Sequence, residues 1–221
     1  MKQNSMTLIR KSKLLNWCFH AKKQFIVLFS LKKVVIMMLL DKYFRYRRVK
    51  VALKNRPKIM DNVFDIGCDD GYLLRKLIHI TKRQDGIDPC TNISPVSNHS
   101  EIKNGFFPLA IKDYQMQASY DAIFALAVFE HFSESDIRQS ASVINRMLSP
   151  KGRLIITIPH PFVDKILDVL ISLHLIEGMK LDEHHGFDPD VLITYFSDFL
   201  RLVKRERFQF GLNNIFVFER L

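Results

Sequence analysis

Short apolar runs alternate with amphipathic stretches along most of the chain, and their order predicts strands that alternate with helices. Asn62 to Ile66 reads as a first strand, which runs into Gly67-Cys68-Asp69-Asp70-Gly71 and then into a helical pattern over residues 72–80. A short second strand is expected at Gly86 to Asp88. The near-continuous apolar run from Tyr120 to Ala127 is typical of a central parallel strand that is covered on both faces.

The second half of the chain continues the alternation and then changes character. Ser133, with Asp136 three residues later, resembles a capping box that opens a helix through Leu148. Ser149 to Gly152 then turn the chain into a strand at Arg153 to Ile158. The remaining expected elements are helices at about residues 162–176 and 188–202 and strands at about residues 203–210 and 214–219, while residues 91–105 show no clear element.

The connection between the last two predicted strands, Gly211 to Asn214, is too short for a crossover helix, so these strands should form an antiparallel hairpin. The expected fold class is therefore α/β, with a doubly wound, mostly parallel seven-stranded sheet that ends in this hairpin. A basic helical N-terminal extension should precede it.

Basic charge is concentrated in that extension. The 221-residue chain has a formal net charge of +10, but its first 60 residues contain 16 Lys or Arg and a single acid, Asp41, whereas the remainder contains 17 basic and 22 acidic residues. A helical pattern rich in basic residues runs from about Asp41 to Lys54. We therefore divide the chain into a basic extension, residues 1–40, and one α/β domain, residues 41–221, of a size that one core supports.

The basic charge and the cysteines indicate which partners the protein binds and in which cellular compartment it lies. The apolar run at residues 25–40 is short for a membrane span and is broken by Lys32 and Lys33, so we reject a span and expect a solvated arm. Contact of residues 1–60 with a nucleic acid or an anionic membrane surface is an alternative that we do not favour. Three unpaired cysteines and the lack of a cleavage site predict a cytoplasmic protein, with a membrane-peripheral one as the alternative.

The loop after the first strand is the first candidate for chemistry. Ligands of doubly wound sheets bind at the carboxyl ends of the strands, where Gly67 and Gly71 permit a tight turn and a close backbone approach. Asp88, at the end of the second strand, can accept hydrogen bonds from both ribose hydroxyls of a nucleoside. Asp65 and Asp69 disfavour a pyrophosphate, because like charges repel, and suit a ligand with an amino group and a sulfonium.

Four segments, in order and at family spacing, resemble motifs of the class I methyltransferases that use S-adenosylmethionine. Val63-Phe64-Asp65-Ile66-Gly67-Cys68-Asp69-Asp70-Gly71 resembles motif I, and Gly86-Ile87-Asp88-Pro89 resembles the post-I motif. Tyr120 to His131 is similar to the fourth strand with its trailing Glu-His, and Leu148 to Leu154 to the turn into the fifth strand. The resemblance covers about residues 55–221 and implies S-adenosylmethionine as the cofactor.

The resemblance also implies which residues bind the cofactor: Asp65, Gly67, Cys68, Asp69, Gly71, Asp88, Phe106, Ala125 and Leu126. In this assignment the loop lines the cofactor's backbone groove, Asp65 lies near its amino acid end and Asp88 binds the ribose. Ala125 and Leu126 flank the methionine portion, and Phe106 contacts the adenine. One departure is Asp69, which stands where the family usually has glycine, so the loop has less conformational freedom here.

The candidates for a general base are His131, His160 and His185. Methyl transfer from a sulfonium is a direct displacement, in which alignment contributes about 7 to 11 kcal/mol against a roughly 10²- to 10⁴-fold gain from a base. Each histidine is expected near the cofactor edge and can deprotonate a hydroxyl acceptor, although His131 can equally serve to order its loop. Glu183 to Asp188 contains metal-ligand types at no standard spacing, so we expect no metal.

We therefore expect a methyltransferase whose acceptor is a small molecule, because no nucleic-acid module is attached to the core. The tail over residues 183–214 is similar to bacterial methyltransferases of sugar or cell-surface polymer pathways, which favours such an acceptor. The alternatives are an RNA methyltransferase whose basic arm binds phosphates, and a membrane-associated enzyme for a lipid or quinone. A third alternative is a non-catalytic scaffold protein of this fold, for which Asp69 is the only indication.

Overall fold

A computed structural model of the chain describes residues 39–90, 94–108, 119–160 and 188–221. The chain divides into two units after Arg45, and residues 39–45 of the first unit are helical. Most of the basic extension and the helix expected at residues 162–176 lie outside the described residues, and the domain boundary at residue 40 stays a prediction. Among the helices that the structure describes, none has the length and apolar character needed to cross a membrane.

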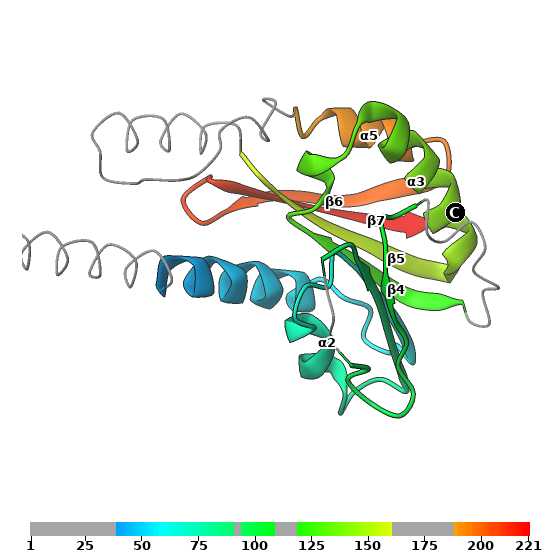
Figure 1. The fold of residues 1–221 in the computed structure, drawn as a ribbon. Helices are drawn as coiled ribbons and strands as arrows, with labels where there is room; N and C mark the ends of the chain where they lie inside the picture. The colour runs from blue at the N-terminus through cyan, green and yellow to red at the C-terminus, as the bar shows by residue number, and fades with distance from the viewer. Residues whose placement is uncertain (1–38, 91–93, 109–118, 161–187) are drawn as a thin grey trace, which may run out of the picture. The chain divides into compact units, whose positions relative to one another are not determined.

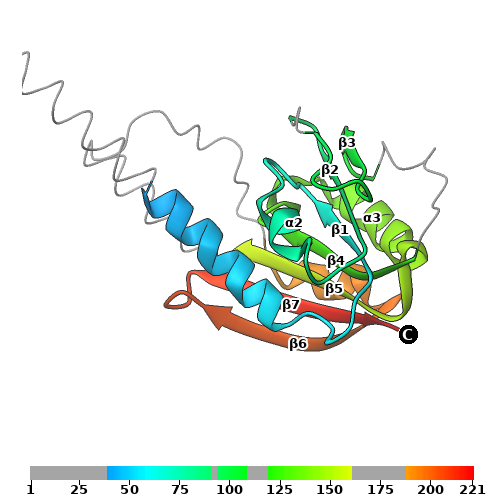
Figure 2. The same ribbon diagram turned by 90° about the horizontal axis from the view of Figure 1, so that it is seen from below.

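The second unit, residues 46–221, is built on a seven-stranded sheet in the order β3-β2-β1-β4-β5-β7-β6 (Figure 2). The elements in chain order are β1 (Asn62–Ile66), α2 (Tyr72–Leu77), β2 (Arg83–Asp88), β3 (Ile102–Asn104), β4 (Tyr120–Leu126), η2 (Phe129–His131), α3 (Glu134–Met147), β5 (Leu148–Pro159), α5 (Val191–Phe196), β6 (Leu200–Phe208) and β7 (Asn213–Arg220). Neighbours from β3 to β5 pair in parallel, whereas β7 is antiparallel to β5 and β6. The predicted doubly wound sheet with a terminal hairpin is confirmed.

The central strand β4 is apolar after Asp121 because both of its faces are covered. Ile123 and Ala125 pack in a cluster with residues of α3 and α5, while Ala122 and Phe124 pack with residues of α2 and with helical residues 46–54. Figure 1 shows α3 and α5 on one side of the sheet and α2 on the other. The successive side chains from Ala122 to Ala125 are therefore all removed from water, which explains the apolar run in the sequence.

The helix α3 begins and ends as its sequence predicts. The Ser133 side chain caps it by accepting a hydrogen bond from the Asp136 backbone N–H at 3.2 Å. The turn expected after the helix lies within β5, between two stretches that pair with β4, and Lys151 in it has a φ of 63°. A Cβ at Gly152 would lie 2.8 Å from the carbonyl oxygen of Ser149, so only glycine fits this turn.

Several element boundaries differ from the expectation, and three of them show how tertiary contacts outweigh the local pattern. The edge strand β3 falls in the stretch that shows no element in sequence, because its side chains are only partly buried. The strand β2 begins at Arg83 rather than Gly86 and buries the polar residues Gln84 and Asp85. The helix expected at residues 188–202 is the shorter α5, since pairing of β6 with β7 takes the chain from Leu200 onward into the sheet.

Candidate functional site

The loop between β1 and α2 is a tight turn held against the end of β2. Gly67, Asp69 and Gly71 all have left-handed backbone conformations, with φ of 72°, 44° and 73°. The backbone N–H groups of Gly67 and Cys68 both donate to the carbonyl oxygen of Ile87, at 2.8 and 3.2 Å, and Gly71 N–H donates to the Cys68 carbonyl at 2.7 Å. Asp69 thus occupies the conformation that glycine adopts without strain, so the departure from the family pattern leaves the turn intact.

Close packing explains why glycine is needed on each side of this loop. A Cβ at Gly67 would lie only 2.4 Å from Cγ2 of Val128, which follows β4. A Cβ at Gly86 in β2 would lie 2.9 Å from Cβ of Cys68. The two glycines therefore allow the loop after β1 to sit directly against its neighbours on β2 and after β4.

Asp88 lies at the carboxyl end of β2 and ties the loop to the chain beyond that strand. Its Oδ2 accepts a hydrogen bond from the Asp69 backbone N–H at 3.0 Å, and its Oδ1 accepts one from the Cys90 backbone N–H at 2.8 Å. A carboxylate has about four lone-pair positions, so each oxygen can accept a further bond. Asp88 is thereby fixed in place with capacity for two hydroxyl groups of a ligand.

Asp65 places a second carboxyl group beneath the same loop. Its side chain is buried, with 4% of the residue exposed. Burial raises the pKa of Asp65 well above its usual range, and the nearby carboxylates of Asp88 and Asp69 raise it further. Burial, and then Asp65, also raise the pKa of the adjacent Cys68 thiol. A cationic group bound here would stabilise the ionised form of Asp65, so the electrostatics of the site favour a positively charged ligand.

The expected contacts on β4 and after β3 reach the same edge of the sheet. Ala125 pairs in register with Ile66 at the end of β1, and the half-buried Leu126 follows it. Phe106 is 67% exposed and follows Gly105, whose N–H donates to the Asp88 carbonyl oxygen at 3.1 Å. The structure therefore brings the residues expected at the cofactor together at the carboxyl ends of β1 to β4, although their roles in binding stay predictions.

The candidate bases are only partly covered by the structure. His131 is exposed at the end of η2, after β4, and the half-buried His160 follows β5 and donates its backbone N–H to the Leu212 carbonyl oxygen at 2.8 Å. Both follow carboxyl ends of parallel strands, at the edge where Asp88 lies. His185 and its neighbour His184 lie outside the described residues. Within the described ranges, no group of three or more His, Cys, Asp or Glu residues is arranged to hold a metal ion.

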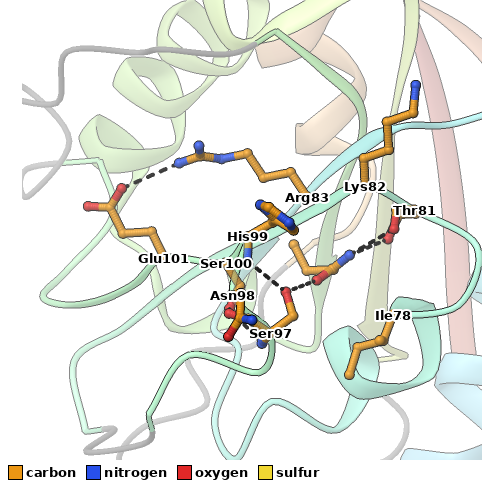
Figure 3. A pocket seen from close by; sticks show the side chains of 10 residues that line it. Ile78, Thr81, Lys82, Arg83, Ser97, Asn98, His99, Ser100 and Glu101 are labelled. Carbon is orange, nitrogen blue, oxygen red and sulfur yellow. Dashed lines mark hydrogen bonds and ion pairs between the residues drawn. The ribbon is translucent and has the colours of Figure 1, made fainter.

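A hollow of about 990 Å³ lies at the opposite edge, by the amino ends of β2 and β3 (Figure 3). Its polar side chains bond to one another: the Gln84 amide donates to Thr81, and Ser97 donates to Gln84 at 2.7 Å. Arg83 reaches Glu101 on its rim. None of the residues expected at the cofactor lines this hollow, so it is separate from the carboxyl edge.

The sequence analysis missed a group of polar residues on β5 and the β6–β7 hairpin. Thr157, Gln209, Asn213 and Asn214 are buried at the carboxyl end of β5, close in register to Leu126. The available signal was the placement of Thr157 inside the apolar strand sequence and of two asparagines directly before the apolar Ile215 to Phe218. The sequence pattern places Asn213 and Asn214 in a turn or at a strand end, where polar residues need no further explanation.

A parallel sheet whose order reverses beside a glycine loop, with an acidic residue ending the next strand, defines an α/β protein that binds a nucleoside cofactor. A family model described as a methyltransferase domain matches residues 39–204, whereas no curated protein matches the chain. The chain belongs to this methyltransferase family, and it is an enzyme that uses S-adenosylmethionine as its methyl donor.

Solved structures of other proteins, a methyltransferase among them, share the fold. The N-methyltransferase NodS from Bradyrhizobium japonicum WM9, in complex with S-adenosyl-L-homocysteine, is 16% identical with a TM-score of 0.53, over 81% of this chain and 86% of that chain. The PH0226 protein from Pyrococcus horikoshii OT3 is 16% identical with a TM-score of 0.59, over 81% of this chain and 91% of that chain. At these identities the likeness shows the fold alone.

Proposed function

We propose that the enzyme transfers the methyl group of S-adenosylmethionine to a small-molecule acceptor, with the donor held at the carboxyl ends of β1, β2 and β4. The observation that carries this assignment is the Asp88 carboxylate, held at 3.0 and 2.8 Å by two backbone amides while each of its oxygens can still accept a hydroxyl. This arrangement suits the two hydroxyls of a ribose.

The remaining residues fit the other parts of the donor. Asp65 supplies a buried carboxyl group whose ionised form the amino group would stabilise, and the acidic loop favours the sulfonium over an anionic phosphate. Ala125 and Leu126 provide an apolar wall for the methionine chain. The exposed ring of Phe106 offers a surface for the adenine.

Methyl transfer depends mainly on the alignment of the acceptor atom with the methyl group of the donor. The sulfonium methyl group is transferred directly to the acceptor atom, so the protein must hold that atom in line with the methyl group and exclude water. Where the acceptor is a hydroxyl, its proton needs a base, and His131, His160 and His185 are the candidates for this role. The similarity of residues 183–214 to methyltransferases of sugar and polymer pathways supports a small acceptor.

Calorimetric titration with S-adenosylmethionine and S-adenosylhomocysteine tests the donor site. We expect binding by the intact protein that weakens by about tenfold or more in Asp88→Asn, because the variant keeps the size of the side chain but loses its charge-assisted hydrogen bonds. Asp198→Asn, an exposed carboxylate outside this edge, is the matched control and should bind normally. Unchanged affinity in Asp88→Asn would contradict the assignment, and no binding by the intact protein would favour the non-catalytic alternative.

A further inference from the structure

The polar group on β5 and the β6–β7 hairpin carries an inference about the acceptor. In the part of the chain that the structure describes, the buried polar atoms without a hydrogen-bond partner include Thr157 Oγ1, Gln209 Nε2, Asn213 Oδ1, and both the Nδ2 and the Oδ1 of Asn214. Each of these residues is more than nine-tenths buried. Buried polar atoms in proteins are nearly always satisfied, so a gathering of such atoms needs an explanation.

The sheet register places Thr157 beside Leu126, which the proposed function places at the methionine portion of the donor. Thr157 pairs with Leu126 of β4 on one side and with Ile215 of β7 on the other. Since side chains alternate along a strand, Asn213 shares the face of Ile215 and Thr157. The Asn213 amide donates to Gln209 Oε1 at 2.6 Å, which links the start of β7 to the end of β6. Thr157, Asn213 and Gln209 thus form one row leading away from Leu126.

Two buried polar residues of β2, Gln84 and Asp85, have hydrogen-bond partners. Asp85 accepts hydrogen bonds from the Tyr120 hydroxyl at 2.6 Å, from Arg83 and from the Glu101 backbone N–H. Gln84 bonds to Thr81 and Ser97. These bonds lie toward the amino ends of the strands, away from Asp88. The atoms of the row lack such partners, and the row lies at the carboxyl edge, where the proposed donor site is.

We propose that Thr157, Gln209 and Asn213 bind the methyl acceptor, and that this acceptor is a neutral molecule rich in hydroxyl groups, such as a sugar. The inference rests on the proposed function, since Leu126 marks the donor's methyl group only if the donor binds as proposed. The row offers an amide N–H donor, an amide oxygen acceptor and a hydroxyl that does both. Because no member of the row carries a charge, the row has no ionic partner for a charged acceptor. Hydroxyl groups both donate and accept hydrogen bonds, so they can bond to each member of the row.

A first experiment compares two threonines, one whose hydroxyl has hydrogen-bond partners and one whose hydroxyl has none. Thr81 Oγ1 donates to the Leu77 carbonyl oxygen and accepts from Gln84, both at 2.8 Å. Thr81→Val should therefore lower the melting temperature of the ligand-free protein by about 2–4 °C or more. Thr157→Val, which removes a hydroxyl without a partner, should leave it unchanged or raise it. A loss in Thr157→Val equal to that in Thr81→Val would overturn the inference.

A second experiment measures methyl transfer from S-adenosylmethionine to methyl glycosides of neutral sugars and to phosphorylated sugars. We expect transfer to a neutral glycoside, with a KM that is raised about three- to tenfold in Thr157→Val. Thr157→Ser, which keeps the hydroxyl, and Thr81→Val should both have the wild-type KM. Transfer to phosphorylated sugars alone, no transfer to any neutral glycoside, or a wild-type KM in Thr157→Val would each overturn the inference.

Titration with S-adenosylmethionine separates this inference from the proposed function. If Asp88-dependent binding of the donor is found but Thr157→Val keeps the wild-type KM, the acceptor assignment alone is wrong. If the donor does not bind, the proposed function itself is wrong, and the acceptor inference loses its basis. Asn213→Leu repeats the measurement on the hairpin and should raise the KM for the glycoside while the donor's Kd stays unchanged.

Discussion

Replacing Gly67 by alanine should destabilise the protein through two separable effects. The residue has a φ of 72°, where an L residue is strained by about 1 to 2 kcal/mol. The new Cβ would also lie 2.4 Å from Cγ2 of Val128, a distance that forces the stiff, β-branched side chain or the loop to move. Overpacking of this kind costs about 1 to 3 kcal/mol. Together the two effects predict a loss of about 2 to 5 kcal/mol in the free energy of unfolding.

Two further variants separate strain from overpacking. Gly211 has a φ of 84°, and nothing lies within 4 Å of a Cβ built on it, so Gly211→Ala should show the strain alone, about 1 to 2 kcal/mol. Val128→Ala removes both methyl groups that the new Cβ would meet. In the Val128→Ala background, Gly67→Ala should therefore cost about as much as Gly211→Ala, which predicts a coupling of about 1 to 3 kcal/mol between the two sites.

Urea unfolding followed by far-ultraviolet circular dichroism measures all four variants and the wild type on one scale. Equal costs of Gly67→Ala in the two Val128 backgrounds would refute the reasoning, as would a cost no greater than that of Gly211→Ala. Either result would mean that the loop can move away from β4 without losing stability. The bonds from Gly67 and Cys68 to the Ile87 carbonyl oxygen would then not be the constraint that we infer.

Three other substitutions test the electrostatics and the buried network. Because the folded-state pKa of Asp65 is raised, the ligand-free protein binds more protons than the unfolded chain, and its stability should fall as pH rises from the ordinary carboxyl pKa through the raised one. Asp65→Asn should remove this dependence of the melting temperature on pH and should weaken donor binding. A wild type whose stability rises relative to that of Asp65→Asn with increasing pH would contradict this direction. Asp69→Gly should be about 1 kcal/mol more stable in urea unfolding than Asp69→Ala, because both variants lose the carboxylate and only glycine adopts a φ of 44° without strain. Equal stability of the two variants would show that the loop is not strained at this position. Tyr120→Phe should lower the free energy of unfolding by about 1.5 to 3 kcal/mol, because it deprives the buried Asp85 of a 2.6 Å hydrogen bond. The affinity for the donor should stay unchanged. An unchanged free energy of unfolding, or weaker donor binding, would count against a purely structural role of Tyr120.

Several elements follow from local sequence, because the interactions that define them lie within a few residues. The strand Asn62–Ile66 and the capped start of α3 are found as predicted. The hairpin of β6 and β7 follows from a connection too short for a crossover helix. The sequence also predicted that the acidic residues Asp65 and Asp88 would meet at one edge, since the carboxyl ends of parallel strands do so.

Other elements depend on residues that are far apart in the chain. The strand β3 has little apolar pattern, and its pairing with β2 defines it. Asp85 is polar and yet buried, because Tyr120, 35 positions later, supplies a hydrogen bond to it. No local pattern predicts such a strand, since the partner that makes its burial favourable is supplied by another strand.

The sequence by itself determined the order of strands and helices, the glycines that the turns require, and the motif resemblance that named the family and the donor. Tertiary structure decided which strand lies beside which, how far burial and neighbouring carboxylates raise the pKa of Asp65, and which polar side chains are left without partners. The physical reason is that dihedral preferences and hydrophobic periodicity act between near neighbours in sequence. Desolvation, charge and hydrogen-bond satisfaction depend instead on everything within a few ångströms, and Thr157, Asn213 and Leu126 become neighbours only when β4, β5 and β7 pair.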